Sequence, residues 1–148
     1  MSKPQVLVAL GCFWPGNDAS GPNQSFIALA SALRREFDFR VVARDREPGA
    51  SASTAPKGWV DLGYAQARYL EVGRFGARGL AGLLRATPHD VLWLNSVYDR
   101  EFTLPALAAA RLGASRAPLI LSPRGEFGSG ALDVKAGKKQ VFLKLARA

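Results

Sequence analysis

Cysteine and histidine are each present only once in this sequence, as Cys12 and His89. A single cysteine excludes a disulfide within the chain. The two residues lie far apart, and His89 stands directly after a proline, which argues against a cysteine–histidine catalytic pair. We therefore interpret Cys12 as a small apolar residue at the end of a strand, and we assign His89 no catalytic role.

Long hydrophobic runs are also missing. Only five apolar residues, at positions 6–10, precede Gly11 near the beginning of the sequence. A signal peptide needs an apolar segment of about 7–15 residues, and a membrane-spanning helix needs about 20. Because neither pattern is present, we expect a cytoplasmic protein.

Acidic residues are few relative to basic ones. Twelve Asp and Glu stand against twenty Lys and Arg, so the formal net charge is +8. This balance favours an anionic partner, such as a nucleotide diphosphate, an acidic lipid surface or nucleic acid. Aromatic residues do not alternate with basic ones in an RNA-binding pattern, so we predict no nucleic-acid partner. One basic cluster suits a solvated helix face and leaves contact with a membrane surface open: Lys135, Lys138, Lys139, Lys144 and Arg147.

The residues that are present suit one globular domain. The chain has 148 residues, of which 48% are hydrophobic and 22% charged, an ordinary balance for a folded protein. Apolar strands are predicted at 6–10, 39–44, 90–95 and 118–121, the last two as buried strands, with helical patterns between most of them. Two short strands at 59–62 and 67–72 are predicted to form a hairpin about Gly63. This alternation predicts an α/β fold over residues 1–148, a Rossmann-like parallel sheet flanked by helices.

Each predicted helix has an apolar stripe or a stop signal. The first, within 24–37, has its stripe at Phe26, Leu29, Ala30, Leu33 and Phe37. The second, within 75–84, carries Gly76, Gly79 and Gly82, which we expect to pack closely on the sheet. The third is capped by Asp99, ends at Gly113 and carries Phe102, Leu104, Leu107, Ala108 and Leu112. A last helix is predicted from about residue 131.

Three loops with unusual glycine and polar content follow predicted strands, at 11–22, 95–101 and 122–130. Parallel sheets bind ligands beyond the carboxyl ends of their strands, so these loops predict a site. The helix start near Asn23 offers free N–H groups to an anion, and Gly21 allows a ligand to approach the backbone. Glycines that only shape a tight turn explain the first loop nearly as well. Its glycines lie five residues apart, which matches neither the dinucleotide fingerprint nor a P-loop.

Several of these segments together are similar to one family. Ser20-Gly21-Pro22-Asn23 before an Ala/Leu-rich helix, the segment 90–96 and the Ser-Pro-Arg-Gly-Glu loop at 122–126 resemble the N-terminal domain of glycosyltransferase family 4. The resemblance covers essentially the whole chain and implies one half of a GT-B architecture. It also implies transfer of a sugar, with retention, from a nucleotide sugar to a glycan or lipid-linked acceptor. The donor-binding C-terminal half is absent here, so we expect a truncated enzyme that is inactive alone.

The resemblance also assigns site residues. Ser20, Gly21 and Asn23 would face the donor phosphates. The acceptor side would be formed by Asn95, Ser96, Tyr98, Asp99, Arg100, Arg124 and Glu126. Many family members have a histidine where Asn95 and Ser96 stand, so the catalytic residues remain unassigned. The implied substrate is a UDP- or GDP-sugar, with no metal requirement and no covalently bound cofactor.

Alternatives remain open at this level. Asp99 or Glu126 would orient an acceptor hydroxyl, or each would act only as a cap or a surface ion-pair partner. Arg124 would bind an acidic acceptor, or simply pair with Glu126. The chain as a whole is also consistent with a non-catalytic Rossmann-like module for an anionic ligand or a protein partner. A basic nucleic-acid-binding domain is the third reading.

Overall fold

The computed structural model of the chain describes residues 2–71 and 76–126. Its strands are β1 (Gln5–Ala9), β2 (Asp38–Arg44), β3 (Trp59–Asp61), β4 (Gln66–Leu70), β5 (Val91–Asn95) and β6 (Leu119–Ser122). Its helices are α1 (Gly21–Leu33), α2 (Gly76–Ala86) and α3 (Thr103–Ala109), and α3 continues into a wide helical turn, η1 (Ala110–Ala114). The expected helix from residue 131 and the lysine cluster lie outside the described residues.

The six strands form one sheet in the order β3-β4-β2-β1-β5-β6. All neighbours are parallel except β3 and β4, which form the predicted hairpin. The predicted α/β fold with a parallel sheet and flanking helices is therefore confirmed. From β1 the chain builds outward through β2 on one side and through β5 on the other, so the order reverses between β1 and β5. This reversal is the topological switch point at which open parallel sheets bind ligands.

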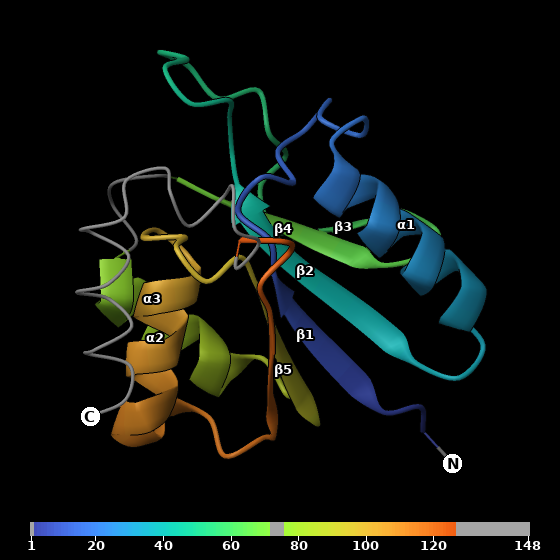
Figure 1. The fold of residues 1–148 in the computed structure, drawn as a ribbon, viewed down its shortest axis with the longest axis vertical. Coiled ribbons are helices and arrows are strands. Elements are labelled where there is room, and N and C mark those ends of the chain that lie inside the picture. The colour runs from blue at the N-terminus through green and yellow to red at the C-terminus, as the bar shows by residue number, and fades with distance from the viewer. Residues whose placement is uncertain (1, 72–75, 127–148) are drawn as a thin grey trace.

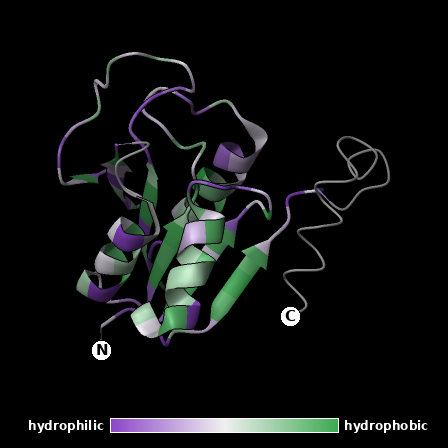
Figure 2. Cartoon of the chain, turned by 90° about the vertical axis from the view of Figure 1, so that its left-hand side faces the viewer, coloured by the Kyte–Doolittle hydropathy of each residue, from purple (hydrophilic) through white to green (hydrophobic). Residues whose placement is uncertain are grey.

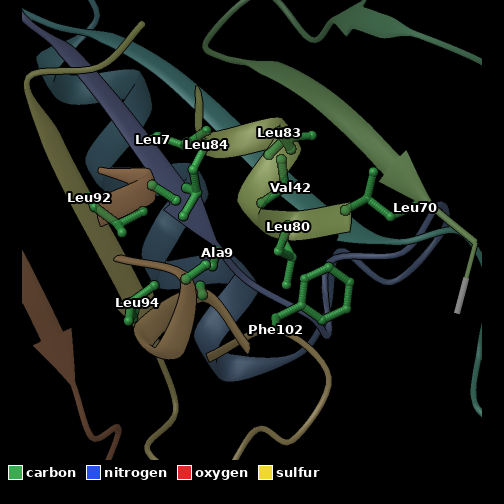
Figure 3. Packing of buried hydrophobic residues seen from close by; sticks show 13 residues of the cluster. Leu7, Ala9, Val42, Leu70, Leu80, Leu83, Leu84, Leu92, Leu94 and Phe102 are labelled. Carbon is green, nitrogen blue, oxygen red and sulfur yellow. The ribbon is translucent and has the colours of Figure 1, made fainter. Parts of the chain in front are cut away.

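Helices cover both faces of the sheet, α1 one face and α2 with α3 the other (Figure 1). Phe26 of α1 is fully buried against the sheet, and its ring meets the Phe13 ring nearly edge-on at 5.4 Å between centroids. On the opposite face, leucines of α2 pack against alternate residues of β1, β2 and β5 (Figure 3). Figure 2 shows the hydrophobic strands between helices of mixed polarity. The central strands β1, β2 and β5 are mostly apolar because both of their faces are covered.

The strand predicted at 118–121 exists, but its predicted burial is wrong. β6 forms an edge of the sheet, and Leu119, Ile120 and Leu121 are 38%, 52% and 40% exposed. Its apolar run resembles that of β5, whose Leu92 and Leu94 are almost fully buried. Burial differs because it depends on the pairing order, which the composition of a single strand does not encode.

The helical stripes also need correction. α1 ends at Leu33, so Phe37 lies beyond it, and Leu29 is 39% exposed. Gly82 is exposed, and a Cβ there would have no atom within 4 Å, so it does not pack on the sheet as expected. The predicted stripe of the third helix is confirmed in part: Phe102 is buried and Leu107 packs against the core, whereas Ala108 and Leu112 are exposed. The buried face is completed by residues outside the predicted stripe, Thr103, Ala106 and Ala109.

The stop at Gly113 is confirmed. Its φ of 81° lies in the left-handed region, where an L side chain would be strained. His89 is engaged away from the carboxyl ends of the strands: its Nδ1 lies 2.6 Å from the Thr87 carbonyl oxygen and its Nε2 lies 2.7 Å from Ser115 Oγ. These contacts give His89 a structural place before β5.

Candidate functional site

A pocket of about 410 Å³ lies at the switch point of the sheet. Leu10 and Gly11, which follow β1, form one wall, and Asn95 and Ser96, at the end of β5, form another. Arg44 closes the side toward β2. The remaining lining residues come from the first loop, the loop after β2 and the segments after β5 and β6: Cys12, Trp14, Pro22, Pro48, Asp99, Arg124 and Glu126. The pocket thus lies where the fold predicts a ligand site.

Two of the predicted loops are joined by paired polar contacts at this pocket. Arg124 donates through Nε and Nη2 to Asn95 Oδ1, at 2.9 and 2.6 Å. In the other direction, Glu126 accepts from Ser96 Oγ and from the Val97 N–H, both at 2.5 Å. Arg124 and Glu126 therefore each hold the β5 loop, and no ion pair between them is found among residues 2–71 and 76–126. Four contacts of this kind fix the distance between the two loops.

The same loops carry unusual backbone conformations. Ser96 has a φ of 69° and Arg124 a φ of 51°, and they are the only non-glycine residues with positive φ in the described part of the chain. Such conformations cost of order 1–3 kcal/mol each and persist where surrounding contacts enforce them, often at functional sites. Here the contacts of Asn95 and Glu126 supply that enforcement.

Beneath Arg124 lies an aromatic support. The guanidinium of Arg124 stands 5.6 Å from the centre of the Trp93 ring, and Trp93 Nε1 donates to Ser122 Oγ at 2.8 Å. Burial lowers the pKa of Arg124, although its side chain remains a cation in the neutral range. Because Asn95 is neutral, its contact with Arg124 leaves this positive charge available at the pocket wall.

Asp99 combines a structural role with a place in the pocket. Its Oδ1 accepts from the N–H groups of Glu101 and Phe102 at 2.9 and 3.0 Å and closes the turn that precedes α3. α3 itself begins at Thr103 with Phe102 at its cap position and no side-chain cap bond, so the predicted capping of the helix by Asp99 is wrong. Its Oδ2 lies 2.5 Å from the position that a Cβ on Gly11 would occupy. Gly11 is therefore needed for the close approach of Asp99. Burial raises the pKa of Asp99, so this carboxyl group binds a proton more readily than an exposed aspartate.

The first loop is held from below by Asn23. This residue is fully buried, and its Nδ2 donates to the carbonyl oxygens of Cys12, at 3.0 Å, and of Asn17. The Cys12 thiol donates to Asn23 Oδ1 at 3.1 Å, and burial raises the pKa of this thiol. Cys12 is consequently more than an apolar filler, since it lines the pocket and ties the loop to α1. The Asn23 side chain is occupied with these contacts and does not face the pocket.

The structure brings part of the predicted set together. Asn95, Ser96, Asp99, Arg124 and Glu126 line the pocket. The lining does not include Ser20, Gly21, Asn23, Tyr98 or Arg100, although Pro22 places the first turn of α1 at its border.

Sequence reasoning missed Trp14 and Arg44 as lining residues. Their signal was positional: an aromatic residue in the loop after the first strand, and a basic residue at the carboxyl end of the second. The loop after β2 contributes Pro48 to the lining.

Residues 2–71 and 76–126 contain no group of three or more His, Cys, Asp or Glu side chains that could hold a metal ion. None of their helices combines the length and the apolar character needed to cross a membrane.

No protein-family model and no curated protein matches this chain. Function must therefore be argued from the pocket itself. Its lining combines planar hydrogen-bonding groups of both charges with one indole, and this combination suits a polar, uncharged or weakly anionic ligand that also has an apolar face.

Proposed function

We propose that this chain is the acceptor-side half of a retaining glycosyltransferase with GT-B architecture, and that the pocket receives a sugar of the acceptor. One observation carries the proposal: the loops after β1, β5 and β6 meet at the switch point around a pocket of about 410 Å³ lined by Asn95, Asp99 and Arg124. In this proposal, the half that binds the UDP- or GDP-sugar donor is not part of the 148 residues.

The chemistry of the lining supports a saccharide. Sugar hydroxyls are both donors and acceptors, and neighbouring hydroxyls match the forked geometry of carboxylates, amides and guanidinium groups. Trp14 supplies an apolar surface on which the carbon–hydrogen face of a sugar ring packs. The cavity also falls in the range of about 300–1,000 Å³ that is usual for small-ligand sites.

The proposal gives roles to individual residues. Asp99, which lines the pocket with its Oδ2 close to Gly11, orients an acceptor hydroxyl, whereas Glu126 is a positioning residue because Ser96 and Val97 occupy its carboxylate. Arg124 binds oxygen atoms of the acceptor. Sugar transfer leaves negative charge on the departing diphosphate, which donors at a helix start stabilise. Ser20, Gly21 and the backbone N–H of Asn23, at the start of α1 beside the pocket, are proposed to face that diphosphate.

Binding of saccharides to the 148-residue chain tests the proposal. Saturation-transfer NMR with a panel of common monosaccharides should show transfer for at least one sugar, and the signal should be lost in Arg124→Ala. Arg85→Ala, an exposed position on α2, is the matched control and should bind as the unmodified chain does. Absence of transfer for every sugar, or equal loss in both variants, would contradict the assignment.

A second candidate is a non-catalytic module for an anionic small molecule. The observation in its favour is Arg124, which lines the pocket and makes no ion pair within the described residues. Titration with inorganic pyrophosphate separates the two candidates. Saturable binding of pyrophosphate together with no binding of any neutral sugar would favour the anion module.

The proposal includes a place of action. A nucleotide-sugar enzyme of this kind works in the cytoplasm, where its donor is made, and the net charge of +8 allows peripheral contact with an acidic membrane surface. Neither a metal ion nor a covalently bound cofactor takes part in the proposed reaction, and nucleic acid is not a partner.

A further inference from the structure

A second hollow of about 380 Å³ lies next to the pocket on the same rim of the sheet. Arg44 and Pro48 line both hollows, so the two share a wall. The second hollow is bordered by the loop after β2, which Figure 1 shows extending beyond the carboxyl ends of the strands. The two hollows are therefore neighbours along this rim, the first at the loop after β1 and the second at the loop after β2.

Arg44, on the shared wall, forms an ion pair with Glu101, which lines the second hollow only. The two side chains are 14% and 43% exposed. Glu101 is partly open to solvent, so its carboxylate and the Arg44 guanidinium can both hydrogen-bond to a ligand that extends from one hollow to the next.

The outer wall of the second hollow has a defined shape. Arg46 contacts Asp45 Oδ1 and the Ser51 carbonyl oxygen, each at 3.1 Å, and lies 3.8 Å from Glu71. The turn closes with a bond from the Ala50 N–H to the Glu47 carbonyl oxygen at 3.1 Å and with Gly49 at a φ of 89°. These contacts hold the loop in place beside the second hollow.

The side chain of Glu47 remains available on this wall. It is exposed, lines the hollow, and forms no ion pair in the part of the chain that the structure describes. With Arg44 and Glu101 it gives the second hollow the same planar donors and acceptors that line the first pocket.

We propose that the two hollows are consecutive subsites for an extended saccharide. The acceptor then has at least two sugar units, one in the pocket and the next between Glu47, Arg44 and Glu101. This inference rests on the proposed function, because it takes the pocket as a sugar site. It adds that the protein recognises an oligosaccharide and gains affinity from the second unit.

Chain-length dependence of binding tests the inference. The probes are glucose, galactose, mannose and N-acetylglucosamine, each compared by calorimetry with disaccharides that contain it, on the 148-residue chain. For at least one sugar, the disaccharide should bind about tenfold more tightly than the monosaccharide, as two or three additional hydrogen bonds would produce.

A bulky residue at the second hollow should remove only this gain. Ala50→Trp places an indole in the hollow and should return the disaccharide to the affinity of the monosaccharide. Ala52→Trp, exposed on the same loop and outside the lining, is the control and should keep the tenfold gain. If Ala50→Trp does not fold, Glu47→Gln serves instead and should reduce the gain at least threefold.

The outcomes separate the two proposals. Equal affinity for monosaccharide and disaccharide, or a gain that survives Ala50→Trp, overturns the second subsite and leaves the sugar pocket standing. Binding of none of these sugars overturns both.

Discussion

At the scale of single residues, Gly11 has little room for a side chain. A Cβ there would lie 2.5 Å from Asp99 Oδ2 and 2.8 Å from Phe102 Cδ2. Gly11→Ala should therefore lower the free energy of unfolding by about 1–3 kcal/mol in urea titrations, because Asp99 and a buried ring must move.

Gly21→Ala, at the first residue of α1, is the control. No atom lies within 4 Å of a Cβ at Gly21, so this change should stay within about 0.5 kcal/mol. Equal losses in the two variants would mean that contacts at Gly11 do not determine the shape of the pocket wall.

Asp99 should make stability depend on pH. Burial raises its pKa, so the folded chain holds the proton more tightly than the unfolded chain does. The stability that comes from this proton is present in acid and is lost as the pH rises through the raised pKa. Asp99→Asn removes the titration, so its free energy of unfolding relative to the unmodified chain should increase from about pH 4 to about pH 7. A difference that is constant over this range would contradict the pKa shift.

At the scale of elements, the start of α1 depends on one buried amide. Asn23→Ala would remove the bonds to Cys12 and Asn17 and leave their carbonyl groups without these donors. We expect a loss of about 2 kcal/mol in the free energy of unfolding, measured by chemical denaturation. Ser25→Ala, exposed on the same helix, should change it by less than about 0.5 kcal/mol. The prediction fails if the two losses are equal.

β5 and β6 provide a direct comparison of a central and an edge strand. Leu94 and Leu121 are partners in the pairing register, but Leu94 is 0% exposed and Leu121 is 40% exposed. Leu94→Ala should cost about 2–5 kcal/mol because it leaves a cavity in the core. Leu121→Ala should cost less than about 1.5 kcal/mol, because much of that side chain is already in water. Thermal and urea unfolding of both variants give the comparison, and an equal cost would show that β6 is covered in solution.

The sequence predicted these elements well but not their surroundings. All six strands lie within a residue or two of their expected positions, because apolar runs bounded by glycine, proline and polar residues mark strands clearly. The predicted burial of β6 and of Ala108 and Leu112 was wrong, since burial depends on which element packs against which. The predicted meeting of the loops after β5 and β6 is present, because parallel strands bring their carboxyl ends to one edge.

Contacts within the site were beyond sequence reasoning. Asn95 and Arg124 are 29 residues apart, and Arg44 and Glu101 are 57 apart, so no local pattern links the partners. The expected choice for Arg124 lay between an acidic ligand and Glu126, and its main partner proved to be the neutral Asn95. A side chain in a loop can reach many neighbours, and only the packed fold selects one.

At the scale of the whole molecule, the proposed function predicts that this chain binds an acceptor sugar but does not catalyse sugar transfer. With a UDP- or GDP-sugar, the 148-residue chain should release no nucleotide above the buffer rate, as measured by chromatography, because the donor half is placed elsewhere. Nucleotide release that is proportional to protein concentration and disappears in Asp99→Asn would show that the chain contains a complete active centre.

The indole of Trp93 gives the molecule an optical sensor of its own. The centre of its ring lies 6.3 Å from that of the buried Phe26 ring and 5.6 Å from the guanidinium of Arg124, and a charge so near an excited indole shifts the wavelength of its emission. A ligand that displaces Arg124 would therefore change the fluorescence emission of Trp93 without a dye or label. The chain can therefore be screened against unlabelled compounds with nothing more than a fluorimeter.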